Sequence, residues 1–127
     1  SPVLTKGDFE VTTRFSNGAN ALKAGEAVTL IAEVTVKKDA EYIMISIPIP
    51  GGCSYADKRK GYKEAHREYF KHETAIFCQK LLQGTYTFEV NLMPRYSGVY
   101  TLNPAKVELM YFPTFSANNE VEKVSVK

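Results

Sequence analysis

The strict alternation of apolar and polar residues in two stretches is the feature that most constrains the fold. One stretch runs from Ala27 to Lys37 and the other from Thr85 to Leu92. Side chains on extended backbone point alternately to opposite faces, whereas an amphipathic helix needs a period of about 3.6 residues. The apolar positions of the first stretch are Val28, Leu30, Ala32, Val34 and Val36. Each stretch therefore predicts a β-strand with one buried face.

Shorter apolar stretches follow one another along the chain and are separated by turn residues. Glycine, proline and asparagine punctuate them, as in the cluster Ser16–Asn20. Residues 42–49 are almost wholly apolar, so that strand should be central and covered on both faces. The remaining strands are expected at residues 8–15, 66–70, 74–81, 98–102, 106–111 and 121–127. About nine short strands predict an all-β fold, an antiparallel β-sandwich with aromatic-rich inner faces.

Length and composition fit one domain over residues 1–127. With 44% apolar residues, the chain can bury a core without a metal or several disulfides. Its net charge of +2 predicts no strong attraction to nucleic acid or to an anionic membrane. No apolar run approaches the roughly 20 residues that cross a bilayer, so membrane insertion is not expected. The chain begins Ser1-Pro2-Val3 without Met, and we expect a fragment of a larger protein.

The two cysteines, Cys53 and Cys78, allow two interpretations. Their spacing fits neither a zinc motif nor a Cys-x-x-Cys redox pair. They are either two buried free thiols or one structural disulfide, and a disulfide would imply an oxidising compartment. The pattern of residues leaves both alternatives open.

No catalytic arrangement is recognisable in the sequence. Ser54 and Ser97 lack the Gly-x-Ser-x-Gly motif, and no orienting group accompanies a pairing of a cysteine with His66 or His72. Six residues of strand would separate the two histidines by about 20 Å, too far for them to share one metal ion. No glycine-rich loop leads into a helix, so a phosphate site is not expected. We expect a domain that is not an enzyme and needs no cofactor or metal.

A basic segment is the best candidate for a contact surface. Six Lys/Arg residues lie between Lys58 and Lys71 together with three aromatic residues, but four nearby carboxylates dilute their field. Nucleic-acid binding requires a more strongly basic face, so the segment is either a solvated loop or a protein-docking surface. Residues 56–65 should form a loop with one helical turn at most. The candidate protein-contact residues are Lys58, Arg59, Lys60, Tyr62, Lys63 and Arg67.

Several short motifs occur in a characteristic order from Tyr42 to the C-terminus. These motifs are a Pro-x-Pro-x-Gly corner at 48–52, an Arg-acidic pair at 67–68, a strand ending in a Leu/Gly turn at 76–84, an aromatic strand at 86–88, a Gly-containing turn at 95–98 and a Pro-Ala-x-x-x-x-Met-Tyr strand at 104–111. Their order and spacing, over about two-thirds of the chain, resemble the C-terminal macroglobulin-like domain of bacterial α2-macroglobulins. That domain is the counterpart of the receptor-binding domain of animal α2-macroglobulins and complement proteins.

The resemblance implies a non-catalytic module of a periplasmic or cell-envelope protease inhibitor. In such proteins a protease cuts a bait region, and the molecule then encloses or covalently holds the attacker. The covalent version needs a Cys-x-x-Gln thioester, which neither Cys53 nor Cys78 matches, so bait and thioester would lie in other domains. The implied partners are other macroglobulin domains of the parent chain and, indirectly, a protease. A periplasmic parent would favour the Cys53–Cys78 disulfide.

The alternative is a stand-alone immunoglobulin-like adhesive or ligand-binding surface module. Its binding face would be the segment Lys58–Lys71. A long parent chain with upstream macroglobulin repeats supports the inhibitor, and a short chain beside surface-attachment domains supports the adhesin.

Overall fold

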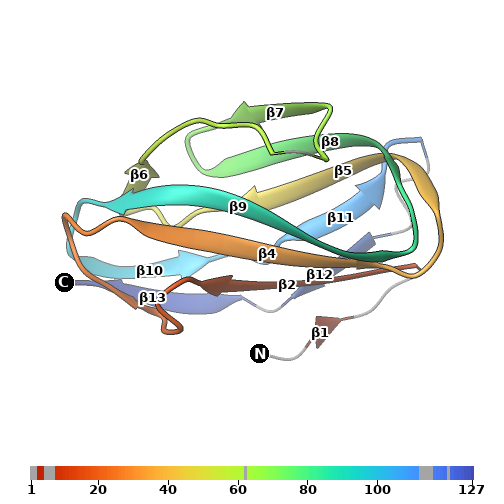
Figure 1. Ribbon diagram of the computed structural model, residues 1–127. Coiled ribbons are helices and arrows are strands. Elements are labelled where there is room, and N and C mark those ends of the chain that lie inside the picture. The colour runs from red at the N-terminus through yellow and green to blue at the C-terminus, as the bar shows by residue number, and fades with distance from the viewer. Residues whose placement is uncertain (1–2, 5–7, 62, 112–115, 120) are drawn as a thin grey trace.

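Two layers of extended backbone make up the structure, which is a computed structural model (Figure 1). It describes residues 3–4, 8–61, 63–111, 116–119 and 121–127, with the backbone alone for 3–4 and 116–119.

Thirteen strands and no helix are present in the residues that the structure describes. The first six are β1 (Val3–Leu4), β2 (Phe9–Phe15), β3 (Ala21–Leu22), β4 (Val28–Val36), β5 (Ala40–Pro48) and β6 (Cys53–Tyr55). The others are β7 (His66–Tyr69), β8 (Glu73–Leu81), β9 (Gly84–Pro94), β10 (Gly98–Leu102), β11 (Lys106–Leu109), β12 (Ser116–Asn119) and β13 (Glu122–Val126).

The strands form three sheets that together make the predicted sandwich. One layer is a six-stranded sheet in the order β1-β12-β11-β5-β8-β7, and the facing layer is a four-stranded sheet in the order β2-β4-β9-β6. A three-stranded sheet, β10-β13-β3, closes one end of the sandwich, near the C-terminus (Figure 1). All pairings are antiparallel except the short parallel pair of β13 with β3.

The alternating stretches behave as predicted. All nine expected strands are present, and β5 lies between β11 and β8 in the middle of its sheet. The four strands that alternation did not predict are β1, β3, β6 and β12, each of two to four residues. Strands this short hold too few side chains for a period of two to be recognised.

The core between the layers is aliphatic, not aromatic as expected. The inward positions of β4 and of β5 are aliphatic and, except for Ala32, branched; Val34 and Ile45, for example, have no exposure. Phe9, Phe15 and Phe88 are the only aromatic residues among the buried residues that the structure describes. Branched aliphatic side chains contain no polar atom, so they can fill a dry interior without a hydrogen-bonding partner.

Tyrosines lie instead around the periphery, where their hydroxyls reach loop carbonyls. Tyr86 donates to the carbonyl oxygen of Leu82 at 2.7 Å, and Tyr100 donates to that of Tyr96 at 2.9 Å. Tyr55 donates to the carbonyl of Glu73 at 2.9 Å. A buried phenol needs such a partner, so these rings settle at the border between the core and the turns.

The ring of Tyr100 leaves room only for glycine at one position of the 48–52 corner. A Cβ at Gly52 would lie 2.4 Å from the ring, whereas one at Gly51 would lie at an ordinary contact distance of 3.5 Å. The glycine at position 52 is therefore required by close packing.

We expect Gly52→Ala to destabilise the protein by about 1–3 kcal/mol, because the new methyl group must displace the Tyr100 ring. The matched variant Gly51→Ala should be neutral or slightly stabilising, because it reduces the freedom of the unfolded chain without a clash. Urea unfolding of the two variants measures the difference. Equal stabilities would contradict the packing at Tyr100.

Candidate functional site

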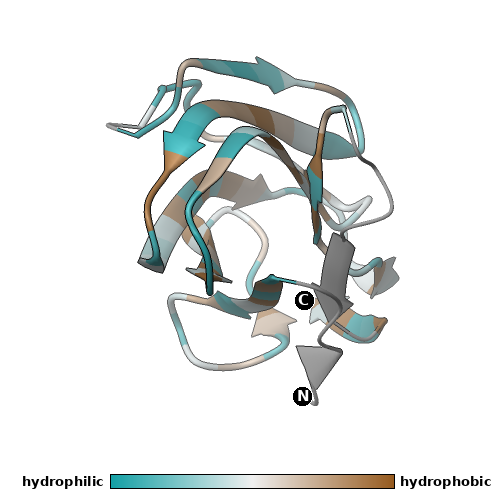
Figure 2. Cartoon of the chain, turned by 90° about the vertical axis from the view of Figure 1, so that its right-hand side faces the viewer, coloured by the Kyte–Doolittle hydropathy of each residue, from teal (hydrophilic) through white to brown (hydrophobic). Residues whose placement is uncertain are grey.

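Exposed large side chains gather where β5 begins and β11 ends, at the end of the sandwich that is turned to the viewer in Figure 2. We call it the aromatic end and define it as Tyr42, Met110 and Tyr111, which are 47%, 44% and 70% exposed. The rings of Tyr42 and Tyr111 meet edge to face, with centroids 5.4 Å apart. Single exposed apolar residues are common on proteins, but a contiguous group with ordered rings is typical of a contact surface.

Tyr42 is held in a strained backbone conformation. Its φ of 56° is the only positive value for a non-glycine residue in the part of the chain that the structure describes. Its carbonyl oxygen accepts a hydrogen bond of 2.8 Å from the N–H of Met110, the residue that follows β11. Strain of this kind is concentrated at functional sites, where the surrounding structure enforces it.

A hollow of about 410 Å³ opens beside the two rings. Its lining includes Phe9 and Leu109, and its rim carries the carboxylates of Asp39 and Glu41. Asp39 is already engaged, because it accepts a hydrogen bond of 2.7 Å from the N–H of Gln83. The hollow is therefore apolar at its centre and acidic at its rim.

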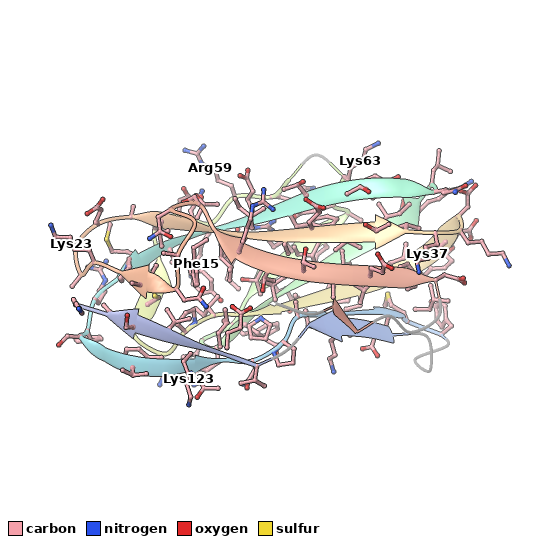
Figure 3. All side chains as sticks on the ribbon, turned by 90° about the horizontal axis from the view of Figure 1, so that it is seen from below. Phe15, Lys23, Lys37, Arg59, Lys63 and Lys123 are labelled. Atoms are coloured by element: carbon pink, nitrogen blue, oxygen red, sulfur yellow. The ribbon has the colours of Figure 1, made fainter. Side chains whose placement is uncertain are left out.

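The basic segment projects from one side of the molecule, as the labelled side chains of Arg59 and Lys63 show in Figure 3. Lys58, Arg59, Lys60 and Lys63 are all exposed, as the sequence suggested. Tyr62 lies outside the described residues. Residues 56–61 and 63–65 form a loop, as predicted, and contain no helical turn.

Arg67, which we expected on that surface, is buried: its side chain is 4% exposed and that of Glu64 is 2% exposed. Arg67 Nε and Nη2 donate to the two carboxylate oxygens of Glu64 at 2.6 and 2.5 Å. Nη1 donates to the Tyr69 hydroxyl at 3.0 Å and to the carbonyl oxygen of Glu89 at 2.7 Å. The guanidinium therefore anchors strands from both sheets and is not available to a partner.

Burial by itself would lower the pKa of Arg67. The hydrogen bonds that Arg67 donates to Glu64 and Tyr69, together with the negative charge of Glu64, outweigh burial and raise this pKa. Arg67 is therefore charged at any ordinary pH, and the pair is a bidentate, charge-assisted contact. In the sequence this pair appears as a glutamate and an arginine three residues apart. We interpreted Glu64 only as a negative charge that weakens the basic segment.

The two cysteines are both free thiols, so the disulfide that a periplasmic parent favoured is absent. Cys53 lies in β6 and Cys78 lies in β8, on different sheets. Cys53 lies opposite Pro94 of β9 and Cys78 lies opposite Ile43 of β5, so strand pairing does not place the two cysteines opposite each other.

Neither the histidines nor the carboxylates gather into a metal site. His66 and His72 are exposed, and His66 Nε2 lies 3.0 Å from Glu68 Oε1. Among the described residues, no three His, Cys, Asp or Glu side chains converge to hold an ion. The part of the chain that the structure describes also contains no helix with the length and hydrophobicity to span a bilayer.

Fold and surfaces together define an all-β, immunoglobulin-like sandwich domain. Residues 4–114 match the family model described as the bacterial alpha-2-macroglobulin MG10 domain. The chain therefore belongs to that family, which confirms the resemblance seen in its motifs.

Solved structures agree on the fold. Salmonella alpha-2-macroglobulin reacted with methylamine is similar to this chain with a TM-score of 0.85 at 15% identity, over 100% of this chain and 10% of that one. The native conformation of E. coli alpha-2-macroglobulin gives a TM-score of 0.81 at 15% identity, again over 100% and 10% of the two chains. The E. coli protein activated by porcine elastase gives a TM-score of 0.85 at 14% identity, over 100% of this chain and 14% of that one.

The chain thus spans only about a tenth of the length of the first solved proteins that it matches. A sequence search of the curated proteins finds no match.

Replacing Tyr42 by Gly should leave the protein about 1 kcal/mol more stable than replacing it by Ala. Both variants lose the ring and its contact with Tyr111, so the difference isolates the backbone. Alanine must adopt the φ of 56° against its preference, whereas glycine adopts it freely. Urea unfolding compares the two variants, and an Ala variant as stable as the Gly variant would argue against strain at Tyr42.

We also expect two slowly reacting thiols per chain. Burial raises the pKa of Cys53 to about 11 and that of Cys78 to about 12, against an ordinary value of 9.0. A pKa of 11 lowers the thiolate fraction at pH 8 by about a hundredfold, so a thiol reagent should react slowly with the native protein. The denatured, unreduced protein should titrate as two thiols. A titration of zero thiols would instead support a Cys53–Cys78 disulfide.

Proposed function

We propose that this chain is a non-catalytic C-terminal module of a bacterial alpha-2-macroglobulin-like protease trap. It acts through contacts with neighbouring macroglobulin domains of a longer parent chain that works outside the cytoplasm, in the cell envelope. The family match over residues 4–114 supports the kind of parent. The aromatic end is the single observation that carries the mode of action.

Three properties of the aromatic end support a docking role. It exposes aromatic and methionine side chains, which are enriched at the centres of protein interfaces. It adjoins a hollow of about 410 Å³ that an apolar protrusion can fill. The backbone conformation of Tyr42 places its ring edge to face with the ring of Tyr111. A tyrosine that becomes a hot spot of an interface costs about 2 kcal/mol or more when it is truncated.

The contact that fits this surface is apolar at its centre and polar at its margin. Asp39 and Glu41 stand at the rim, so a neighbouring domain that surrounds its apolar protrusion with basic or hydrogen-bond-donating groups would match it. A contact of this kind fixes the orientation of two domains and involves no bond-making chemistry.

An adhesive module is the second candidate, and the basic segment is the observation that favours it. Lys58, Arg59, Lys60 and Lys63 form an exposed group that an acidic partner would fit. In the first proposal the same residues are a second surface for a neighbouring domain. The order of domains in the parent gene separates the two functions.

In the full-length parent, the double change Met110→Ser and Tyr111→Ser should weaken the trap. An enclosed protease is shielded from large protein substrates but reaches small peptides. We expect cleavage of a large substrate by captured trypsin to rise at least tenfold, while cleavage of a small peptide stays unchanged. The matched control is Val99→Ser, which changes a residue that is 72% exposed at the opposite end of the sandwich (Figure 1).

Unchanged shielding in a folded double variant would contradict a docking role for the aromatic end. A parent that binds a surface ligand through the basic segment, and never shields trypsin, would support the adhesive function instead.

A further inference from the structure

Strand β9 has one edge that is largely without a neighbouring strand. Along its other edge β4 pairs with it from Gly84 to Leu92. On the open side β6 pairs only with the last residues, from Leu92 to Pro94. An uncovered strand edge offers its N–H and C=O groups to other chains, and proteins commonly cover such an edge with a loop.

Residues 56–61 and 63–67, which contain most of the basic residues, lie along this edge and are called the segment below. The N–H of Ala56 donates to the carbonyl oxygen of Asn91 at 2.9 Å, and Arg67 Nη1 donates to that of Glu89 at 2.7 Å. Asn91 Nδ2 also donates to the carboxylate of Asp57, at 3.0 and 3.2 Å. The segment therefore occupies the place where a longer β6 would have paired.

A second set of bonds closes the segment from the other sheet. The Tyr69 hydroxyl in β7 donates to the carbonyl oxygen of Arg59. The buried carboxylate of Glu64 receives two hydrogen bonds from Arg67 in the same strand as Tyr69. Gly61 packs so closely on this carboxylate that a Cβ there would lie 2.5 Å from Glu64 Oε2. The segment is thus tied at Ala56, Asp57, Arg59 and Glu64.

The same segment carries Lys58, Arg59, Lys60 and Lys63, all exposed. Trypsin-like proteases cut after Lys and Arg, and they act on loops that open locally because the substrate must become extended. A surface loop with four such residues would ordinarily be among the first places to be cut. Its many fixed points oppose that local opening.

We propose that Glu64 and Arg67 form a latch that holds residues 56–61 and 63–64 against the open edge of β9 and keeps their four basic residues from trypsin-like cleavage. The latch is a property of the packing of this chain. Its use, survival of a module that works beside attacking proteases, rests on the proposed function.

The variants that test the latch avoid the ion pair itself. Removing Glu64 or Arg67 leaves the other charge buried without a partner, and such a variant can fail to fold. Tyr69→Phe removes only a hydroxyl that bonds Arg59 and Arg67, and keeps the ring contact with Tyr55. Gly61→Ala instead pushes on the Glu64 carboxylate. Arg14→Gln is the matched control, because it breaks an exposed ion pair with Glu33 of 3.6 Å elsewhere.

The measurement is limited trypsin digestion of the native chain, with each cut followed by mass spectrometry. Lys23, an exposed residue just before the turn at 24–26, is the internal reference, because the backbone bonds of that turn reach Lys127 and Pro94 and do not involve the segment (Figure 3). In the wild-type chain we expect cuts at Lys58 to Lys63 to be slower than the cut at Lys23. Tyr69→Phe and Gly61→Ala should speed the cuts in the segment at least tenfold and leave Lys23 unchanged, and Arg14→Gln should change neither.

Cleavage of the wild-type segment as fast as that at Lys23 would overturn the latch. So would unchanged rates in both variants, or a rise at Lys23 equal to the rise in the segment, which indicates global loosening. The digestion concerns this chain alone, so a parent that fails to trap proteases would leave the latch supported and contradict only the proposed function.

Discussion

The structure depends on the packing of two aliphatic sheet faces against each other, because this dry interior excludes side chains that need hydrogen bonds. The inward positions of β4, β5 and β9 are filled by residues such as Leu30, Ile45 and Val90, with almost no exposure. Because this interior contains so few polar atoms, groups that need hydrogen bonds are placed at its margin. Tyr55, Tyr86, Tyr100 and the Glu64–Arg67 pair lie there, and their hydrogen bonds fix the neighbouring loops.

The features that bear on function lie at two margins. At the aromatic end the margin is left apolar and open, with Tyr42 held in a strained conformation by the bond from Met110. Along the β7–β9 side the margin is closed by Arg67, which joins a β7 side chain to a β9 carbonyl. The aromatic end thus leaves two rings exposed, whereas the β7–β9 side is closed by hydrogen bonds between the sheets.

The strands were predictable because a period of two is a local property, and β4 shows it in nine consecutive residues. The burial of Glu64 was not predictable in this way, because it depends on β9, which is distant in the chain. The positive φ of Tyr42 likewise leaves no trace in the residue type, because tyrosine has no preference for that conformation. Pairing Cys53 with Cys78 failed because an even number of cysteines carries no information about distance. The sequence correctly predicted that Lys58, Arg59, Lys60 and Lys63 are exposed. It did not predict the hydrogen bonds of Arg67 and Tyr69 that hold their backbone in place.

Strand pairing also limits the order in which the domain can assemble. β3 pairs with β13 across about a hundred residues of chain (Leu22 opposite Val126), and β4 pairs with β9 across more than fifty (Val28 opposite Leu92). Contacts between such distant segments form slowly, because closing a long loop costs conformational entropy before the stabilising contacts can form. During synthesis β3 therefore has no strand partner until β13 has been made, and Leu22 lies opposite Val126 only then.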